Sequence, residues 1–302
     1  MDGRISNLAQ VASLTRYTIS EGEGRGLDVL DCNNGTLRFL INLSRGADVM
    51  QLYHKGENVS FVSKNGFNTK TDDFLSRFEG GMLYTCGLDS VGGREGYELH
   101  GKHHLAIAHL VRAEVDEGGI VIEAVMRESA LFGKSLFFRR KITSAIHEET
   151  LHIEDILTNE DTERANYCLL YHINIGYPML DEGAKLSAEL LSSEPRTPWA
   201  KENADTMLEM SAPSPRMEEC CYFWHLGTPR VTLYNPKNKK RFSLTYSGDT
   251  LPEFVEWKSM ASGDYALGLE PSTTKLDDGF IYRTIESGES IRFYVKLTVR
   301  EE

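Results

Sequence analysis

Two histidines and one glutamate stand in short polar segments of a sequence that otherwise has the pattern of β-strands. The segments are Leu99-His100-Gly101, Tyr171-His172-Ile173-Asn174 and Gly268-Leu269-Glu270-Pro271. An imidazole can give up a proton near neutral pH, and a carboxylate can accept one. His100, His172 and Glu270 could therefore perform acid/base chemistry without a metal or a nucleotide, if the fold brings the three side chains together.

The strand predicted over residues 167–177 places His172 on a polar face. Side chains alternate between the two faces of a strand, so Tyr171 and Ile173 share one face, while His172 shares the other with Asn174 and Gly176. Such a face packs poorly in a core but suits the wall of a pocket, because it offers polar groups and room for a ligand. From this strand alone, a buried histidine with satisfied hydrogen bonds is an equally good interpretation.

The strand predicted over residues 265–270 gives Glu270 small neighbours. Ala266 and Gly268 share its face and leave room beside the carboxylate, while the leucines between them face the other way. Pro271 lacks an amide hydrogen, so we expect the strand to end there, with Glu270 at a strand end. The alternative is a solvated surface glutamate.

Further polar residues upstream could extend such a site. Arg77 has the rigid fork of donors that suits sugar hydroxyls or an anion, although a surface ion pair is the alternative. His103 and His104 follow His100 and are expected at a pocket rim or on the surface. No Cys/His/Glu spacing typical of a metal site is present, so we predict neither a metal nor any other cofactor.

Composition narrows the classes of partner. The formal net charge of −12 disfavours nucleic acid and anionic membrane surfaces as partners. No apolar run approaches the roughly 20 residues of a membrane helix, and no secretory signal is visible at the N-terminus, so we expect a cytoplasmic protein. The five cysteines are scattered without a C-x-x-C spacing, and we interpret them as reduced thiols.

The chain of 302 residues predicts an all-β protein. β-Branched and aromatic residues alternate with polar ones between turn residues, as half-buried antiparallel strands require. The clearest runs are 36–41, 120–126, 136–142, 230–234, 242–246 and 291–299. We predict a single domain over residues 1–302 with an N-terminal extension of about residues 1–20. Helical patterns are confined to residues 5–11 and 201–210, the segment 191–215 is an excursion between strands, and the basic run 237–241 is a hairpin tip.

The polar segments resemble those of the aldose 1-epimerase, or galactose mutarotase-like, superfamily, and in particular a bacterial branch of it. The resemblance covers most of the chain and rests on residues 78–89, Leu99-His100-Gly101, residues 171–183 and Gly268-Leu269-Glu270-Pro271-Ser272-Thr273. It implies a large antiparallel β-supersandwich, in agreement with the strand pattern. The segment around His172 and the residues after Glu270 differ from the signatures of well-studied mutarotases, so the resemblance does not imply which sugar is used.

The resemblance also implies roles for individual residues. Glu270 matches the glutamate that removes the proton from the anomeric hydroxyl, and His172 matches the histidine that protonates the ring oxygen. Such ring opening and reclosure needs two proton-transfer groups on opposite sides of the hemiacetal. The further residues expected to bind substrate are His100, which would polarise the sugar, Arg77, Asn174, and Asp181 as a candidate for the acidic residue.

These expectations describe an isomerase that interconverts the anomers of a small-molecule sugar. One alternative is a carbohydrate-binding or regulatory protein on the same fold without turnover. Another is a hexose-phosphate 1-epimerase, which would need several cations converging on the phosphate, and Arg77 with Lys102 or Lys258 gives thin support. Trp257 or Trp224 could stack on a sugar face, with a core position as the alternative for each.

Overall fold

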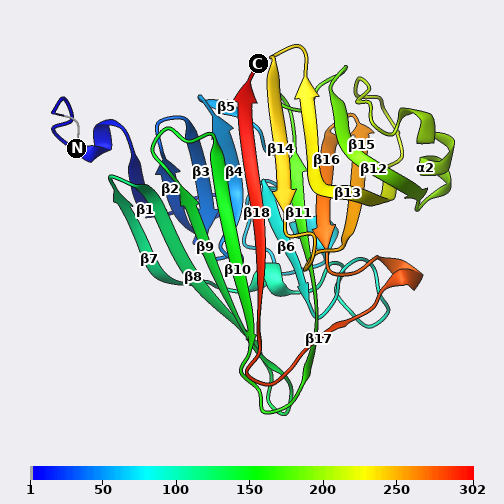
Figure 1. Ribbon diagram of the computed structural model, residues 1–302, viewed down its shortest axis with the longest axis horizontal. Coiled ribbons are helices and arrows are strands. Elements are labelled where there is room, and N and C mark those ends of the chain that lie inside the picture. The colour runs from blue at the N-terminus through cyan, green and yellow to red at the C-terminus, as the bar shows by residue number, and fades with distance from the viewer. Residues whose placement is uncertain (1–2) are drawn as a thin grey trace.

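Two antiparallel β-sheets make up the protein, for which a computed structural model describes residues 3–302 (Figure 1). The smaller sheet has the order β1-β2-β3-β4-β5, with β1 Ser13–Thr18, β2 Asp28–Asn33, β3 Leu37–Asn42, β4 Asp48–His54 and β5 Glu57–Asn58. The larger sheet has the order β17-β11-β16-β15-β13-β14-β18-β10-β9-β8-β7, and in addition β6 pairs with β11 and β12 with β13.

The strands of the larger sheet are long. They are β6 Leu83–Leu88, β7 His109–Asp116, β8 Gly119–Ser129, β9 Ser135–Ser144, β10 Thr150–Asn159, β11 Ala165–Ile175, β12 Lys185–Pro195, β13 Cys220–Asn235, β14 Lys240–Tyr246, β15 Glu253–Ala261, β16 Asp264–Ser272, β17 Arg283–Ile285 and β18 Ser290–Glu301. The predicted all-β fold class is therefore confirmed.

Helices are short and lie in the connections. They are α1 Phe74–Arg77 and α2 Pro198–Glu202, with the 3-10 helices η1 Leu8–Gln10, η2 His103–Leu105, η3 Ala204–Thr206 and η4 Asp277–Gly279. Of the two predicted helical stretches, residues 5–11 contain only η1, and residues 201–210 contain only the end of α2 and η3. Within residues 3–302, no helix has the length and apolar character that crossing a membrane requires.

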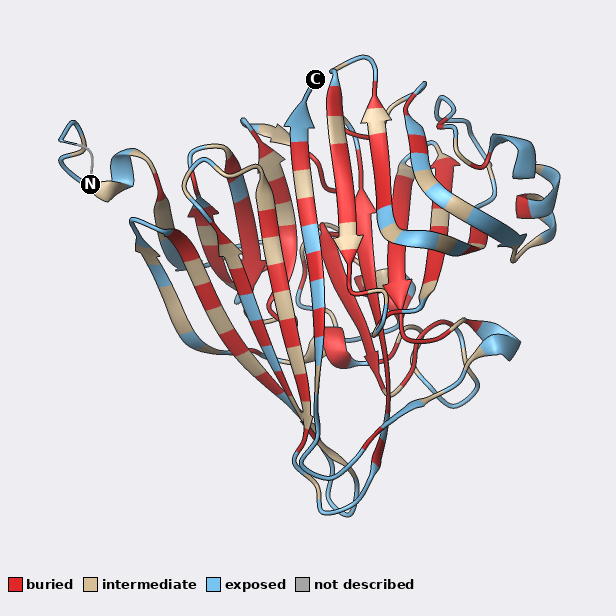
Figure 2. Cartoon of the chain, in the orientation of Figure 1, coloured by how far each residue is buried: buried red, intermediate tan, exposed pale blue. Residues whose placement is uncertain are grey.

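The strand predictions agree with the observed elements, because burial follows their alternation (Figure 2). In β8 and β9 buried residues alternate with more exposed ones, as a sheet with one face in the core requires. The basic run 237–241 lies at the turn between β13 and β14, as predicted. β1 falls within the predicted N-terminal extension and pairs with β2 in the smaller sheet.

The hydrophobic core has two main parts, besides a small cluster of Leu27, Val29, Leu40 and Met50. The larger part contains buried residues of both sheets, among them Phe39, Tyr171 and Phe293. The smaller part packs against the opposite face of β11, where Cys168 and Leu170 contact it. All five cysteines are free and buried, in agreement with the interpretation of reduced thiols. Consecutive residues of β11 therefore serve two separate regions of the molecule.

A buried ionic network joins the two sheets. The Arg140 guanidinium on β9 donates to Asp155 of β10 through Nε at 2.9 Å and Nη2 at 2.7 Å, and to Asp48 of β4 through Nη1. Tyr171 of β11 donates its hydroxyl proton to Asp155 at 2.7 Å, and His104 lies 3.2 Å from Asp48. This network fixes β11 from the side opposite His172.

Candidate functional site

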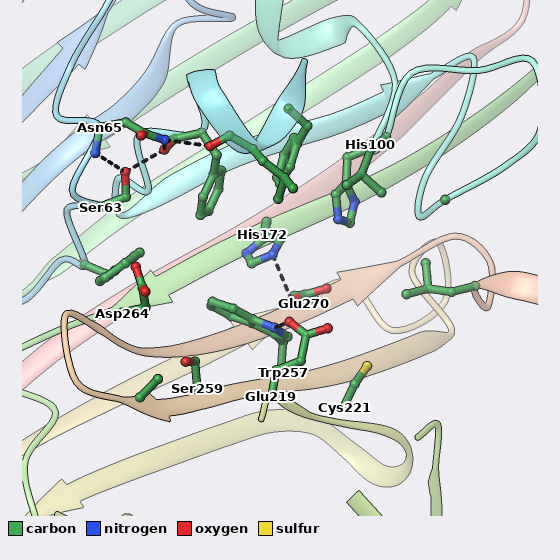
Figure 3. A pocket seen from close by; sticks show the side chains of 18 of the residues that line it. Ser63, Asn65, His100, His172, Glu219, Cys221, Trp257, Ser259, Asp264 and Glu270 are labelled. Atoms are coloured by element: carbon green, nitrogen blue, oxygen red, sulfur yellow. Dashed lines mark hydrogen bonds and ion pairs between the residues drawn. The ribbon is translucent and has the colours of Figure 1, made fainter. Parts of the chain in front are cut away.

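The candidate site is a cavity of about 670 Å³ on the face of the large sheet that carries His172 (Figure 3). Strands β11, β15 and β16 form its floor, α1 contributes Phe74, and the connections β5–α1, β6–η2, β12–β13 and β16–β17 complete the walls. The polar and charged side chains that line it, together with Trp257, include His100, His172, Arg196, Glu219, Ser259, Asp264, Glu270 and Lys64.

His172 and Glu270 are in direct contact on this floor. The pairing of Ile173 with Leu269 and of Leu170 with Ser272 puts these two side chains opposite each other on β11 and β16. His172 Nε2 lies 3.1 Å from Glu270 Oε1, and the two side chains are only 7% and 2% exposed. The predicted acid and base thus lie in one cavity as neighbours.

Gly268 provides the space for this contact. A Cβ atom at Gly268 would lie 2.7 Å from Glu270 Oε1 and 3.1 Å from both His172 Cε1 and Trp257 Cε3. The Trp257 ring packs beside His172, with 5.7 Å between the ring centroids. The small residue that the sequence places two positions before Glu270 is therefore required by the close approach of three side chains.

Burial favours the neutral form of both groups. It raises the pKa of Glu270 to about 8, although the positive charge of Arg196 acts in the opposite direction. Burial likewise lowers the pKa of His172 to about 3, helped by His100 and opposed by the Asn174 side chain. Between these two values the pair holds a single proton, so one member can donate while the other accepts.

His100 lines the same cavity, with its ring centroid 5.6 Å from that of His172. Its backbone has a φ of 63° and is followed by Gly101 at 74°, where a Cβ would collide with Gly87 O at 2.5 Å. The Gly92 N–H donates to His100 Nδ1 at 3.4 Å, which leaves Nε2 as the protonated nitrogen. Burial lowers the pKa of His100 to about 4, so the ring is a neutral donor.

Arg77 and Asn174 lie behind the cavity wall and do not line it. Arg77 is buried on α1 and pairs with Glu98 at 2.8 Å, while Phe74 stands next to it. The buried guanidinium of Arg77 thereby holds the loop that carries His100, and its contact with sugar hydroxyls stays a prediction. Asn174 donates to the His172 backbone oxygen at 3.0 Å and supports that strand from within.

Asp181 lies outside the cavity, in an ion pair with Lys237 at 3.1 Å, and its assignment as the acidic binding residue stays a prediction. The sequence pattern did not reveal that the chain after β11 leads Asp181 to the β13–β14 turn. His103 and His104 are 2% exposed in η2, so the expectation of a rim or surface position is wrong.

Pro271 does not end β16. The strand continues to Ser272, and Pro271 itself pairs with Phe254 of β15. The pairing with β11 is interrupted over the positions that hold Pro271 and Glu270, so the missing amide hydrogen falls where the ladder is already open. Glu270 accordingly lies within a central strand and not at its end.

Several cavity residues have no counterpart in the sequence predictions. Arg196 forms a bidentate ion pair with Asp277 at 2.5 and 2.8 Å, and Lys64 pairs with Asp264 at 2.7 Å. Glu219 accepts a hydrogen bond from Trp257 Nε1 at 2.7 Å. Alternation on β15 could have indicated Ser259 beside Trp257. Arg196 and Glu219 lie in the irregular connection between β12 and β13, where no periodic signal exists.

The excursion and two loops are fixed around the cavity. Arg94 stands 3.8 Å from the centroid of Phe280 and donates to the Tyr282 hydroxyl at 2.9 Å. This contact joins the loop that carries His100 to the loop after β16. Trp224 lies in the larger core, which leaves Trp257 as the tryptophan that could stack on a ligand.

Metal ligands do not gather in this cavity or elsewhere in the part of the chain that the structure describes. No group of three or more His, Cys, Asp or Glu side chains over residues 3–302 has a geometry that could hold a metal ion. The groups on this floor whose chemistry allows proton transfer are His172 and Glu270, with His100 beside them as a neutral hydrogen-bond donor.

Known structures share this architecture. A protein from Klebsiella pneumoniae that carries the provisional name aldose 1-epimerase aligns with a TM-score of 0.88 and 20% identity, over 98% of this chain and 87% of that one. A galactose mutarotase-like protein from Clostridium acetobutylicum aligns with a TM-score of 0.72 and 15% identity, over 97% of this chain and 100% of that one. These likenesses show a galactose mutarotase-like fold.

Sequence comparison assigns the family. No curated protein matches the chain. Residues 24–299 match the family described as a domain of unknown function, DUF4432, which is most of the sequence. The chain belongs to the DUF4432 family and builds it on a galactose mutarotase-like β-sandwich.

Proposed function

We propose that the protein is an enzyme of the aldose 1-epimerase type, which interconverts the anomers of a free sugar. The observation that supports this most directly is the contact of 3.1 Å between His172 Nε2 and Glu270 Oε1 on the floor of a cavity of about 670 Å³. In a cyclic sugar, the ring oxygen and the anomeric hydroxyl are attached to the same carbon. Two adjacent groups that share one proton can serve both oxygens together.

The proposed reaction conserves the proton count. The resting pair carries its proton on Glu270, and transfer of that proton to His172 gives the reactive form. Glu270, now the carboxylate, removes the proton of the anomeric hydroxyl while His172, now protonated, gives its proton to the ring oxygen. The bond between the anomeric carbon and the ring oxygen breaks and leaves an open-chain aldehyde. Rotation about the C1–C2 bond and reclosure with the reverse proton transfers give the other anomer. His100 donates from Nε2 to the reacting oxygens and holds them in place.

A neutral sugar fits the charges of the cavity better than a hexose phosphate. Lys64 and Arg196 line the cavity, and each is already paired with an aspartate. Lys258 is not among the lining residues, because its ammonium group donates to buried backbone oxygens of residues 206–209. A phosphate would need cations that are free to converge on it.

Polarimetry with a panel of aldoses tests the proposal. We expect the wild type to accelerate mutarotation of at least one sugar, and Glu270→Gln and His172→Ala each to lower kcat by at least about 100-fold, because each removes one proton-transfer group. Glu218→Gln, next to the cavity residue Glu219 but facing solvent, is the matched control. Far-ultraviolet circular dichroism of each variant checks the fold.

Two results would contradict this assignment. Equal rates for the wild type and Glu270→Gln on every responsive sugar would remove the carboxyl from the mechanism. Sugar binding without any acceleration by the wild type would favour the alternative of a carbohydrate-binding protein on the same fold.

A further inference from the structure

The cavity extends well beyond the proton-transfer pair. Trp257, Ser259 and Ala261 on β15 face it in succession, and across the hairpin Asp264 lines its far end. From Glu270 to Asp264, strand β16 covers roughly 20 Å at about 3.3 Å per residue. The floor is therefore longer than one sugar ring bound at Glu270.

The volume of the cavity agrees with this length. Sites of about 300–1,000 Å³ usually hold ligands of drug size, which are larger than one hexose, and this cavity of about 670 Å³ lies within that range. Because binding pockets usually enclose most of the surface of their ligand, a single ring would leave much of this cavity to solvent.

The far end offers both hydrogen-bond donors and acceptors. Lys64 Nζ and Asp264 Oδ2 are 2.7 Å apart, with side chains that are 65% and 45% exposed, and Ser259 lies between them and Trp257 along the floor. Figure 3 shows Ser259 and Asp264 on the side of Trp257 away from His100. A neutralised ion pair does not select an anion, but it matches hydroxyls that both donate and accept.

We propose that Lys64, Ser259 and Asp264 form a distal subsite for a second sugar residue, so that the preferred substrate is a reducing disaccharide. This inference rests on the proposed function for the identity of the reacting ring. The reducing-end ring binds at His172 and Glu270, Trp257 lies under the glycosidic linkage, and the non-reducing ring reaches the distal subsite.

The test compares mutarotation of maltose, lactose and cellobiose with that of glucose and galactose. We expect kcat/KM of the wild type to be higher for at least one disaccharide than for either monosaccharide. In Asp264→Ala the ratio of disaccharide to monosaccharide kcat/KM should fall about tenfold, the effect of losing a hydrogen bond to a charged group. Lys185→Ala breaks an ion pair of similar exposure outside the cavity and should leave that ratio unchanged.

Other outcomes overturn the subsite. It is wrong if monosaccharides are turned over better than every disaccharide, if Asp264→Ala lowers kcat/KM for both classes equally, or if glucose 6-phosphate is the best substrate. If the wild type accelerates no sugar, the proposed function fails, and saturation-transfer NMR decides the subsite separately. Tighter binding of maltose than of glucose, weakened in Asp264→Ala, would support it, while equal binding would refute it.

Discussion

The acid and the base of the proposed site are neighbours on adjacent strands. The resemblance implied two groups on opposite sides of the hemiacetal, but the structure has His172 Nε2 and Glu270 Oε1 3.1 Å apart. This arrangement still serves the reaction, because the two reacting oxygens share one carbon. Because His172 and Glu270 are in contact in the free protein, the proton that they share can pass from one to the other.

The pH dependence of kcat/KM tests this shared proton. Burial raises the pKa of Glu270 to about 8 and lowers that of His172 to about 3, so the pair keeps its proton up to about pH 8 and loses it above. We expect kcat/KM to be level between about pH 5 and pH 7 and to fall as the pH rises through about 8. Polarimetry, after subtraction of the uncatalysed rate, measures this profile, and a fall below pH 7 would contradict the shared proton.

The sequence predicted the centre of the site but not its periphery. His172 and Glu270 stand on regular strands, where alternation tells which face each side chain takes. Arg77 and Asp181 were predicted by their place in the resemblance, and the structure puts both outside the cavity. Their positions depend on how a short helix and a loop pack, and single residues in irregular segments carry no periodic signal of their direction.

At the scale of elements, the β15–β16 hairpin sets the geometry of the floor. Its register places Trp257 opposite Gly268, and the absence of a side chain at Gly268 lets Trp257, His172 and Glu270 meet. The loop that carries His100 approaches this floor from the other side. Arg94 and Arg77 hold that loop through Tyr282 and Glu98.

Gly268→Ala should separate the reacting pair. The added Cβ would lie 2.7 Å from Glu270 Oε1, a distance that forces the carboxyl to move. Since alanine suits a strand at least as well as glycine, we expect the melting temperature to change little and kcat to fall at least about tenfold. Gly118→Ala, in the exposed β7–β8 turn, is the control for polarimetry. An unchanged kcat in Gly268→Ala would show that the contact is not needed.

At the scale of the whole molecule, the Arg140 network connects the two sheets through Asp48 and Asp155. Removing one partner of a buried ion pair leaves uncompensated charges, here both carboxylates. We expect Arg140→Ala to lower the free energy of unfolding by about 3 to 5 kcal/mol. Urea unfolding measures this, with Arg127→Ala as a surface ion-pair control. A loss below about 1 kcal/mol would mean that the network adds little to sheet association.

The sequence predicted the fold class well and the arrangement of the sheets less well. Long runs such as 291–299 alternate strictly, and β18 contains that run. Pro271 misled the prediction because a proline removes only one N–H donor from a strand. Here the missing donor falls at a position where β16 and β11 are not paired. The pairing of β6 with β11 depends on contacts between distant segments, which single-strand patterns do not encode.

Strand β11 carries the Tyr171 hydroxyl into the ionic network and the His172 ring into the cavity, one residue apart. Because side chains alternate along the strand, Tyr171 faces the interior between the sheets and His172 faces the cavity. A substitution of His172 is therefore expected to change the cavity while leaving the ionic network between the sheets in place.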